Sequence, residues 1–220
     1  MTKYIEERPD LEPLMRDNWE VIALNGVKVN HRWMGVDIQK HPMDFWVYQE
    51  MLFEIKPDVI LEIGNYTGGS TYAFAHLCDI MNKGRIISVD VTDQNHDPRP
   101  ELQDHPRIQW VVADATQPNV IQAIKNMIEP HERVLVIEDS SHTYDNTIKV
   151  INAYHDLIRP GDYFIVEDTV CWHGLNVGPK PGAYEAVEEF LAKNPNWEAD
   201  RSKEKFILTW TPKGFLRRKY

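Results

Sequence analysis

Residues 58–71 constrain the fold more than any other part of this sequence. The stretch begins with Val59–Ile63, an apolar run rich in β-branched residues, which is typical of a buried strand. It continues through three glycines and ends in small hydroxyl residues, which predicts a tight turn into a helix. A turn of this kind leaves backbone N–H groups free to bind an anion or a nucleotide-like ligand.

Glu62 distinguishes this turn from a phosphate-binding loop. A carboxylate at this position would repel a pyrophosphate, and the G-x-G-x-x-G pattern of dinucleotide-binding proteins is absent. Both observations argue against an NAD-dependent oxidoreductase. The acid suits a ligand that carries cationic groups and hydroxyls, such as S-adenosylmethionine.

Strand-like and helix-like segments alternate along the rest of the chain. Strands are expected at 58–63, 84–91, 108–116, 132–142 (with its exit) and 162–169, and helices at 42–55, 70–82, 117–128, 143–157 and 182–193. Two later segments, Trp197–Asp200 and Lys205–Thr211, have the pattern of a β-hairpin, and the basic tail after them is expected to be solvated. The alternation predicts an α/β fold with a mostly parallel, seven-stranded sheet, helices on both faces and a C-terminal β-hairpin.

Composition narrows the function classes. The chain has 220 residues and a net charge of -10, so one domain of ordinary size is expected and nucleic acid is a poor partner. Its 2 cysteines match neither a disulfide framework nor a zinc site. The first residues lack the apolar core of a signal peptide, and no apolar run approaches the ~20 residues that span a bilayer. We expect a cytoplasmic protein with an N-terminal cover segment (1–40) and one main domain (41–220).

Asp90 and Asp114 end the second and third predicted strands. Asp90 follows the glycine turn by about 20 residues, where an acid can accept hydrogen bonds from both hydroxyls of a ribose. Asp114 could accept a hydrogen bond from an exocyclic adenine amine, or it could cap the helix that follows. The carboxyl edge of an open α/β sheet is where ligands bind, so both acids are candidate ligand contacts.

Three further carboxylates, Asp139, Glu167 and Asp168, end two consecutive apolar strands. Consecutive parallel strands are usually neighbours about 5 Å apart, so these acids would repel one another without a cation between them. Oxygen ligands favour Mg²⁺, with Mn²⁺ or Ca²⁺ as alternatives. Individual acids could instead cap helices or pair with Lys or Arg. His142 lies three residues after Asp139, and it is either a general base beside the ion or a structural histidine.

These motifs together resemble the cephalosporin hydroxylase family of S-adenosylmethionine-dependent methyltransferases, which includes rhamnosyl O-methyltransferases. The resemblance runs from about Trp33 to Leu216. It is carried by the residues Trp33–Val36, Asp44–Glu50, Glu62-x-Gly64-x-x-x-Gly68-Gly69-Ser70, Ile87–Asp90, Asp139-x-x-His142, Val166–Thr169, Pro181–Val187 and Asp200–Phe206. The chain has Ser141 where some members carry a second acid.

The resemblance implies a Rossmann-like class I methyltransferase fold for residues 41–220 and a set of site residues. It places S-adenosylmethionine against the glycine turn and the strand-end acids. The implied cofactor-binding residues are Glu62, Gly64, Tyr66, Gly68, Gly69, Ser70, Asp90, Asp114 and Asp139. It also implies Mg²⁺ at Asp139, Glu167 and Asp168, with His142 as the catalytic base.

The expected activity is metal-dependent O-methylation of a sugar or glycosylated natural product whose vicinal diol chelates Mg²⁺. A β-lactam substrate remains an alternative, and so does a catechol, because Trp33, Trp172 and His173 are expected near the mouth of the site. A non-catalytic subunit of a biosynthetic complex is an alternative of another class, although such a role needs neither metal ligands nor His142. The family resemblance also makes a homo-oligomer a reasonable expectation.

Overall fold

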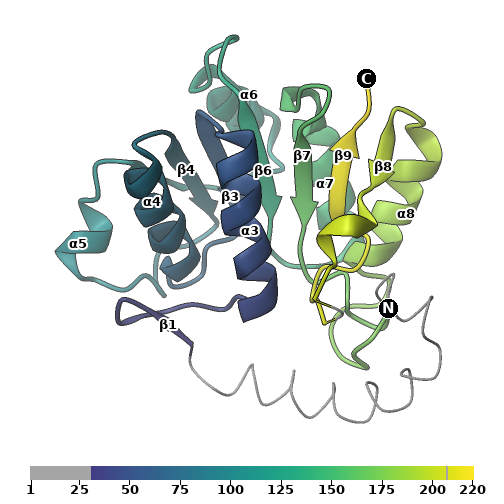
Figure 1. Cartoon of the computed structure of the whole chain (residues 1–220), viewed down its shortest axis with the longest axis horizontal. Helices are drawn as coiled ribbons and strands as arrows, with labels where there is room; N and C mark the ends of the chain where they lie inside the picture. The colour runs from purple at the N-terminus through teal and green to yellow at the C-terminus, as the bar shows by residue number, and fades with distance from the viewer. Residues whose placement is uncertain (1–30, 207) are drawn as a thin grey trace.

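A seven-stranded sheet forms the centre of the computed structural model, which describes residues 31–206 and 208–220 (Figure 1). The strand order is β5-β4-β3-β6-β7-β9-β8. The strands are β3 (Val59–Ile63), β4 (Arg85–Asp90), β5 (Ile108–Val112), β6 (Val134–Glu138), β7 (Tyr163–Val166), β8 (Trp197–Ala199) and β9 (Phe215–Arg218). β3 to β7 run parallel, and β9 is antiparallel to both of its neighbours. The predicted, mostly parallel sheet is confirmed.

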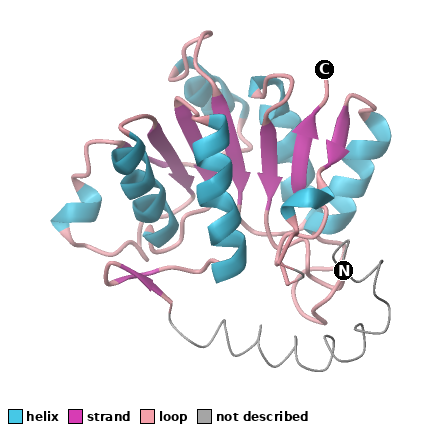
Figure 2. Ribbon diagram, in the orientation of Figure 1, coloured by secondary structure: helices cyan, strands magenta, loops and turns pink. Residues whose placement is uncertain are grey.

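Helices cover both faces of this sheet, as predicted (Figure 2). The long helices are α3 (Pro42–Ile55), α4 (Gly69–Met81), α6 (Pro118–Asn126), α7 (Tyr144–Tyr154) and α8 (Ala183–Lys193). α3 and α4 pack on one face, and α6, α7 and α8 pack on the other. Every residue of β3 and β6 is buried because helices cover these two central strands on both sides.

Short helical turns complete the described chain. They are α5 (Pro100–Gln103), η2 (His155–Leu157) and η3 (Arg201–Lys203). α5 lies between the predicted strands 84–91 and 108–116, where no helix was predicted, because four residues that begin at a proline are too short to show helical periodicity. The bounds of α3 match the prediction, since Pro42 suits a first turn and Lys56, in a left-handed conformation before Pro57, ends the helix.

The prediction of the second strand of the C-terminal hairpin is wrong. The described residues of Lys205–Thr211 form no strand, and β8 pairs instead with β9, which lies in the tail that was expected to be solvated. Leu208 and Trp210 pack against Val170 and Leu175, which explains their apolar alternation without a strand. The antiparallel pair at the end of the chain is therefore present, with a longer connection than predicted.

A small antiparallel hairpin precedes α3. Its strands are β1 (Arg32–Trp33) and β2 (Val36–Asp37). It lies at the same edge of the molecule as the carboxyl ends of the parallel strands (Figure 1). Residues 1–30 of the predicted cover segment lie outside the described residues. In the described ranges, no helix is long and apolar enough to cross a membrane.

Candidate active site

The strand order reverses between β3 and β6, and the glycine-rich turn lies at this point. Such a switch point opens a crevice at the carboxyl edge of the sheet. Gly64 has a φ of +87°, and a Cβ there would collide with the carbonyl oxygen of Asp139. The glycine therefore lets the exits of β3 and β6 lie in direct contact.

Asp90 anchors the same turn. Its Oδ2 accepts hydrogen bonds from the backbone N–H groups of Asn65 at 2.9 Å and Tyr66 at 3.1 Å. The sequence predicts a ribose contact for Asp90, and the structure adds that this acid also fixes the path of the turn.

Glu62 lies beneath the turn and is fully buried. Its carboxylate accepts a hydrogen bond from Thr71 Oγ1, and Ser88 Oγ lies 3.4 Å away. Burial raises the pKa of this carboxyl, while the Lys40 ammonium and the hydroxyls of Ser70 and Thr71 oppose the rise. The geometry gives Glu62 a role in supporting the turn from below.

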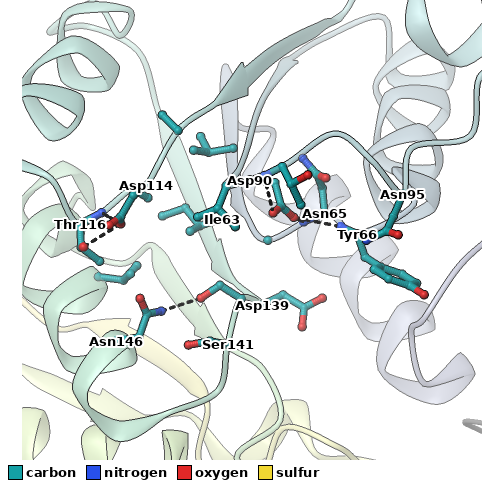
Figure 3. Close-up of a pocket in the computed structure, with 18 residues that line it drawn as sticks. Ile63, Asn65, Tyr66, Asp90, Asn95, Asp114, Thr116, Asp139, Ser141 and Asn146 are labelled. Carbon is teal, nitrogen blue, oxygen red and sulfur yellow. Dashed lines mark hydrogen bonds between the residues drawn. The ribbon is translucent and has the colours of Figure 1, made fainter.

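A cavity of about 290 Å³ opens above the ends of β3, β4, β5 and β6 (Figure 3). Small-molecule sites commonly begin near 300 Å³. Five residues of the predicted cofactor set line it: Gly64, Tyr66, Asp90, Asp114 and Asp139. The other four do not: Glu62, Gly68, Gly69 and Ser70 lie in and behind the turn, where they shape it.

Asp114 lines the far end of this cavity from Asp139 (Figure 3). Its Oδ1 accepts hydrogen bonds from the backbone N–H and the hydroxyl of Thr116, at 2.8 Å and 2.7 Å. Gln117 and Thr116 hold the pKa of Asp114 below its usual value. The alternative role as helix cap is wrong, because Gln117 occupies the N-cap of α6.

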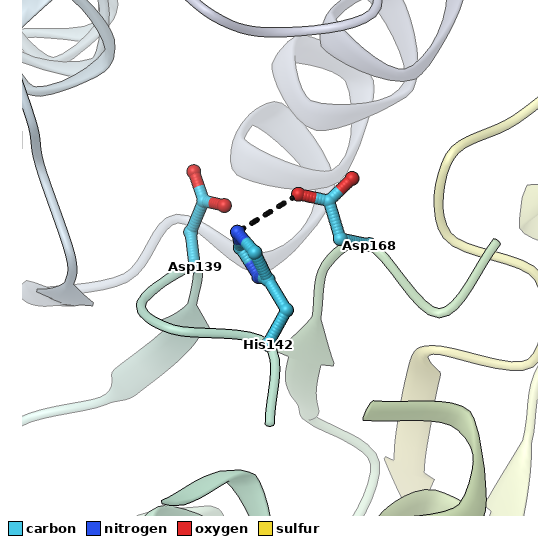
Figure 4. A group of neighbouring side chains, drawn as sticks. All are labelled: Asp139, His142 and Asp168. Atoms are coloured by element: carbon cyan, nitrogen blue, oxygen red, sulfur yellow. Dashed lines mark ion pairs between the residues drawn. The ribbon is translucent and has the colours of Figure 1, made fainter. Parts of the chain in front are cut away.

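Asp139, His142 and Asp168 form a cluster beside the cavity (Figure 4). One ligand atom from each of them lies within 4.8 Å of the others. His142 Nε2 is 3.1 Å from Asp168 Oδ2. His142 and Asp168 both have positive φ values, of 56° and 54°, a conformation rare outside glycine that recurs at functional sites. Two carboxylates and an imidazole converging at a cavity edge can hold a divalent cation.

Glu167, the third predicted metal ligand, is not part of this cluster. The pairing of β6 with β7 places Glu167 next to Asp139, because its N–H donates to the Glu138 carbonyl at 2.9 Å. Its Oε1 accepts a hydrogen bond from Lys40 Nζ at 2.6 Å, and the same ammonium donates to Asp139 Oδ2. Burial raises the pKa of both carboxyls, and Lys40 opposes the rise. The alternative pairing of acids with a basic residue thus occurs in this structure.

Glu138 shapes the loop that carries Asp139 and His142. This buried acid accepts hydrogen bonds from Ser140 Oγ at 2.8 Å and Ser140 N at 3.2 Å, and Thr147 Oγ1 lies at 3.4 Å. Burial alone would lower the pKa of His142. The nearby carboxylates outweigh this effect and raise the pKa above its usual value; they are those of Asp168, Asp139, Glu138 and Glu167. The surroundings of His142 therefore favour an imidazole that takes up a proton.

Sequence reasoning missed several residues at the site. Asn65, Asn95 and Asn146 line the cavity, and Asn146 also donates to Ser140 Oγ at 2.7 Å (Figure 3). Asn146 lies in the first turn of α7, directly after the loop that carries Asp139 and His142. No local pattern marks Lys40, since lysine is almost always exposed.

The three aromatic residues expected at the mouth of the site lie elsewhere. Trp33 packs on Phe45 and donates its Nε1–H to His76 Nδ1 at 2.8 Å, so it anchors the hairpin. Trp172 Nε1 donates to the carbonyl of Gly178 at 2.9 Å within the loop after β7. His173 stacks on Tyr184. None of the three lines the cavity above the glycine turn.

The parallel strands with an antiparallel β9, together with the glycine turn after β3, define the Rossmann-like fold of S-adenosylmethionine-dependent methyltransferases. Residues 25–219 match the family model described as Rhamnosyl O-methyltransferase/CmcI, so the chain belongs to that family. The rhamnosyl O-methyltransferase of Mycobacterium leprae is 32% identical over 193 residues, which cover 85% of this chain and 82% of the relative. The Mycobacterium tuberculosis protein of the same name is 31% identical over 189 residues, which cover 84% and 76%. The predicted family is confirmed.

Solved structures of CmcI share the fold. The form described as Mg-SAM is 25% identical with a TM-score of 0.69, and the match covers 86% of this chain and 77% of that one. An apo form superimposes with a TM-score of 0.70 at 24% identity, covering 86% and 76%. An O-methyltransferase from Bacillus cereus is more distant, with a TM-score of 0.52 at 20% identity over 81% and 79% of the two chains.

Proposed function

We propose that this protein moves a methyl group from S-adenosylmethionine to a sugar hydroxyl, on an acceptor whose vicinal diol faces a bound Mg²⁺. One observation carries the proposal: Asp139 lines the cavity and also belongs to the cluster with His142 and Asp168. A methyl donor bound in the cavity and a methyl acceptor bound at the cluster would therefore both lie beside Asp139. Holding two reactants in this way supplies much of the acceleration in group transfer.

The relatives support the donor and the acceptor class. Two curated relatives at 31–32% identity are named rhamnosyl O-methyltransferases, and the CmcI structure at 25% identity holds Mg and SAM. We infer the same donor and a sugar or glycosylated natural product as acceptor for this chain.

For the donor, the cavity offers polar contacts at both ends. Asp90 would accept hydrogen bonds from the ribose hydroxyls, and Asp114 would accept one from the adenine amine. The backbone of Gly64 and Tyr66 would border the methionine portion, next to Asp139. Glu62, Gly68, Gly69 and Ser70 would act indirectly, by holding the turn that carries these contacts.

For the metal, Asp139, Asp168 and Glu167 are the proposed ligands, and the donor set suits a hard cation. When bound, Mg²⁺ would lower the pKa of the acceptor hydroxyl, and S-adenosylmethionine would supply the methyl group. His142 would take the hydroxyl proton at Nδ1, because its Nε2–H points to Asp168, and transfer of the methyl group from sulfur to the acceptor oxygen would leave S-adenosylhomocysteine. Asp168 would orient the imidazole through the contact seen at 3.1 Å.

The proposal is tested by measuring S-adenosylhomocysteine release with rhamnosides, other sugars, catechols and a β-lactam, each with Mg²⁺ and with EDTA. Metal-dependent turnover of sugars alone is expected. Turnover of catechols alone would replace the acceptor class. Donor binding without turnover of any sugar would favour the non-catalytic alternative.

Asp168→Ala should separate the metal from the donor. We expect metal-dependent turnover to fall by at least about 100-fold, because a ligand and the partner of His142 are lost together. The Kd for S-adenosylmethionine, measured by calorimetry, should stay within about threefold, since Asp168 does not line the cavity. Asp145→Ala, an exposed acid in α7, is the matched control. Full activity of the Asp168 variant would remove the metal assignment.

A further inference from the structure

Lys40 is a buried cation at the edge of the candidate active site. Only 3% of it is exposed, and it lies between β2 and α3. A lysine is rarely buried to this extent without compensating charges, because removing an ammonium from water costs several kcal/mol. The compensation comes from Asp139 and Glu167, which both accept hydrogen bonds from its Nζ.

The position of Lys40 explains why Glu167 stands apart from the cluster. Asp139, His142 and Asp168 offer atoms within 4.8 Å of one another, whereas Glu167 directs Oε1 at the lysine, 2.6 Å away. Glu167 is itself only 5% exposed, so water cannot compensate the charge of its carboxylate. The Lys40 ammonium therefore lies between Asp139 and Glu167, where it neutralises the repulsion between the two carboxylates.

We propose that Lys40 is a positioning residue that takes the place of the divalent cation. It neutralises Asp139 and Glu167 while the metal is absent, and it releases Glu167 to the cluster when the metal binds. The second half of this inference rests on the proposed function, since it assumes that these acids bind Mg²⁺. Mg²⁺ would then compete with the Lys40 ammonium for Asp139 and Glu167. Its affinity for the site would be lower than if the two acids had no such partner.

The chain before Lys40 contacts the glycine-rich turn. Three residues earlier, the carbonyl of Asp37 accepts a hydrogen bond from Thr67 Oγ1 at 2.6 Å. Thr67 belongs to the glycine-rich turn. The segment 37–40 therefore contacts the turn at one end and the acids at the other.

The test uses Lys40→Met in the full-length protein, with differential scanning fluorimetry and calorimetric titration of MgCl₂ alone. Without metal, the variant should unfold roughly 10 °C lower, because the buried Glu167 and the largely covered Asp139 lose their shared cation. Its Kd for Mg²⁺ should nevertheless be about tenfold lower than that of the wild type, since the competing cation is gone. Lys83→Met is the control, because Lys83 pairs with Asp58 at 3.1 Å through half-exposed side chains.

The direction of the Mg²⁺ effect separates this role from a structural one. A lysine that only stabilised the fold would leave Mg²⁺ affinity unchanged or weaker when removed, and either result overturns the inference. If the wild type binds no Mg²⁺, the proposed metal site fails. In that case, binding gained by Lys40→Met still supports the exchange, and absence of binding in both proteins overturns it.

A second variant covers the case in which Lys40→Met does not fold. Lys40→Met combined with Glu167→Gln removes the ammonium together with the acid that it neutralises. We expect the double variant to recover at least about half of the lost melting temperature, because breaking a pair costs more than removing it. A double variant as unstable as the single one would contradict the pairing role of Lys40.

Discussion

At the scale of single residues, Gly64 lies directly against the backbone of Asp139. It brings the cofactor cavity and the acid cluster onto adjoining loops. The glycine is required here for two separate reasons: its positive φ and the absence of space for a Cβ. The two reasons can be measured separately, because the chain contains a second glycine with only one of them.

Gly64→Ala is expected to destabilise the protein by about 2–5 kcal/mol, the sum of a left-handed alanine and an overpacked backbone contact. Gly161→Ala is the matched control, since Gly161 has a φ of +90° and a Cβ added there would meet nothing within 4 Å. It should cost only about 1–2 kcal/mol. Urea unfolding of both variants provides the comparison, and equal losses would show that the contact with Asp139 is unimportant.

Local sequence was sufficient for some residues of the site and insufficient for others. The glycines, Asp90, Asp114 and Asp139 could be predicted, because each ends a strand or forms a turn with a recognisable pattern. Lys40 could not, since its partners lie 99 and 127 residues away and only the register of β6 with β7 brings them together. The hydrogen bond of Glu167 with Lys40 could not be predicted for the same reason.

At the scale of elements, the β1–β2 hairpin is tied to the glycine turn and to the loop before α5. Arg99 donates to the carbonyls of Met34 at 3.1 Å and Gly35 at 3.0 Å, and Thr67 donates to the carbonyl of Asp37. The hairpin has few residues and could not be stable alone. The hairpin therefore depends on its contacts with the rest of the described chain.

Thr67→Val should loosen the hairpin without removing side-chain volume. The carbonyl of Asp37 loses its donor, which costs about 1–3 kcal/mol if it stays buried. Hydrogen exchange of the Ile38 amide, which donates to the His31 carbonyl at 2.8 Å, should accelerate by roughly 5–150-fold. Thr67→Ser keeps the hydroxyl and should exchange at the wild-type rate. Unchanged exchange in the valine variant would mean that the hairpin is held by other contacts.

Helices and inner strands were predictable from periodicity, because burial on one or both faces imposes it directly on the sequence. The C-terminal strands show where this fails. Lys205–Thr211 has the alternation of a strand, but its described residues lie against Val170 and Leu175, and Trp210 N–H donates to Asp44 at 2.7 Å. β9 has only two buried positions, Phe215 and Leu216, followed by arginines, and so looks like a solvated tail.

At the scale of the whole molecule, β9 joins the parallel part of the sheet to β8. Phe215 is fully buried, and its ring lies 6.1 Å from that of Tyr48 in α3. β9, near the C-terminus, therefore packs in the same hydrophobic core as α3, the first long helix of the described chain.

Phe215→Ala should cost about 3–5 kcal/mol, because a large buried ring leaves a cavity between α3 and the sheet. For a domain of this size the melting temperature should fall by roughly 6–20 °C. Phe53→Ala, at a ring 65% exposed on α3, should change stability by no more than about 0.5 kcal/mol. Equal effects of the two substitutions would place β9 outside the cooperative unit.

The location of β9 has a consequence for how the protein is made. It follows every other strand in the chain, yet it lies inside the sheet, between β7 and β8. While residues 215–218 are still within the ribosome, β7 presents an unpaired edge and β8 has no strand to join. Until β9 is added, the edge of β7 is therefore open to pairing with a strand of another copy.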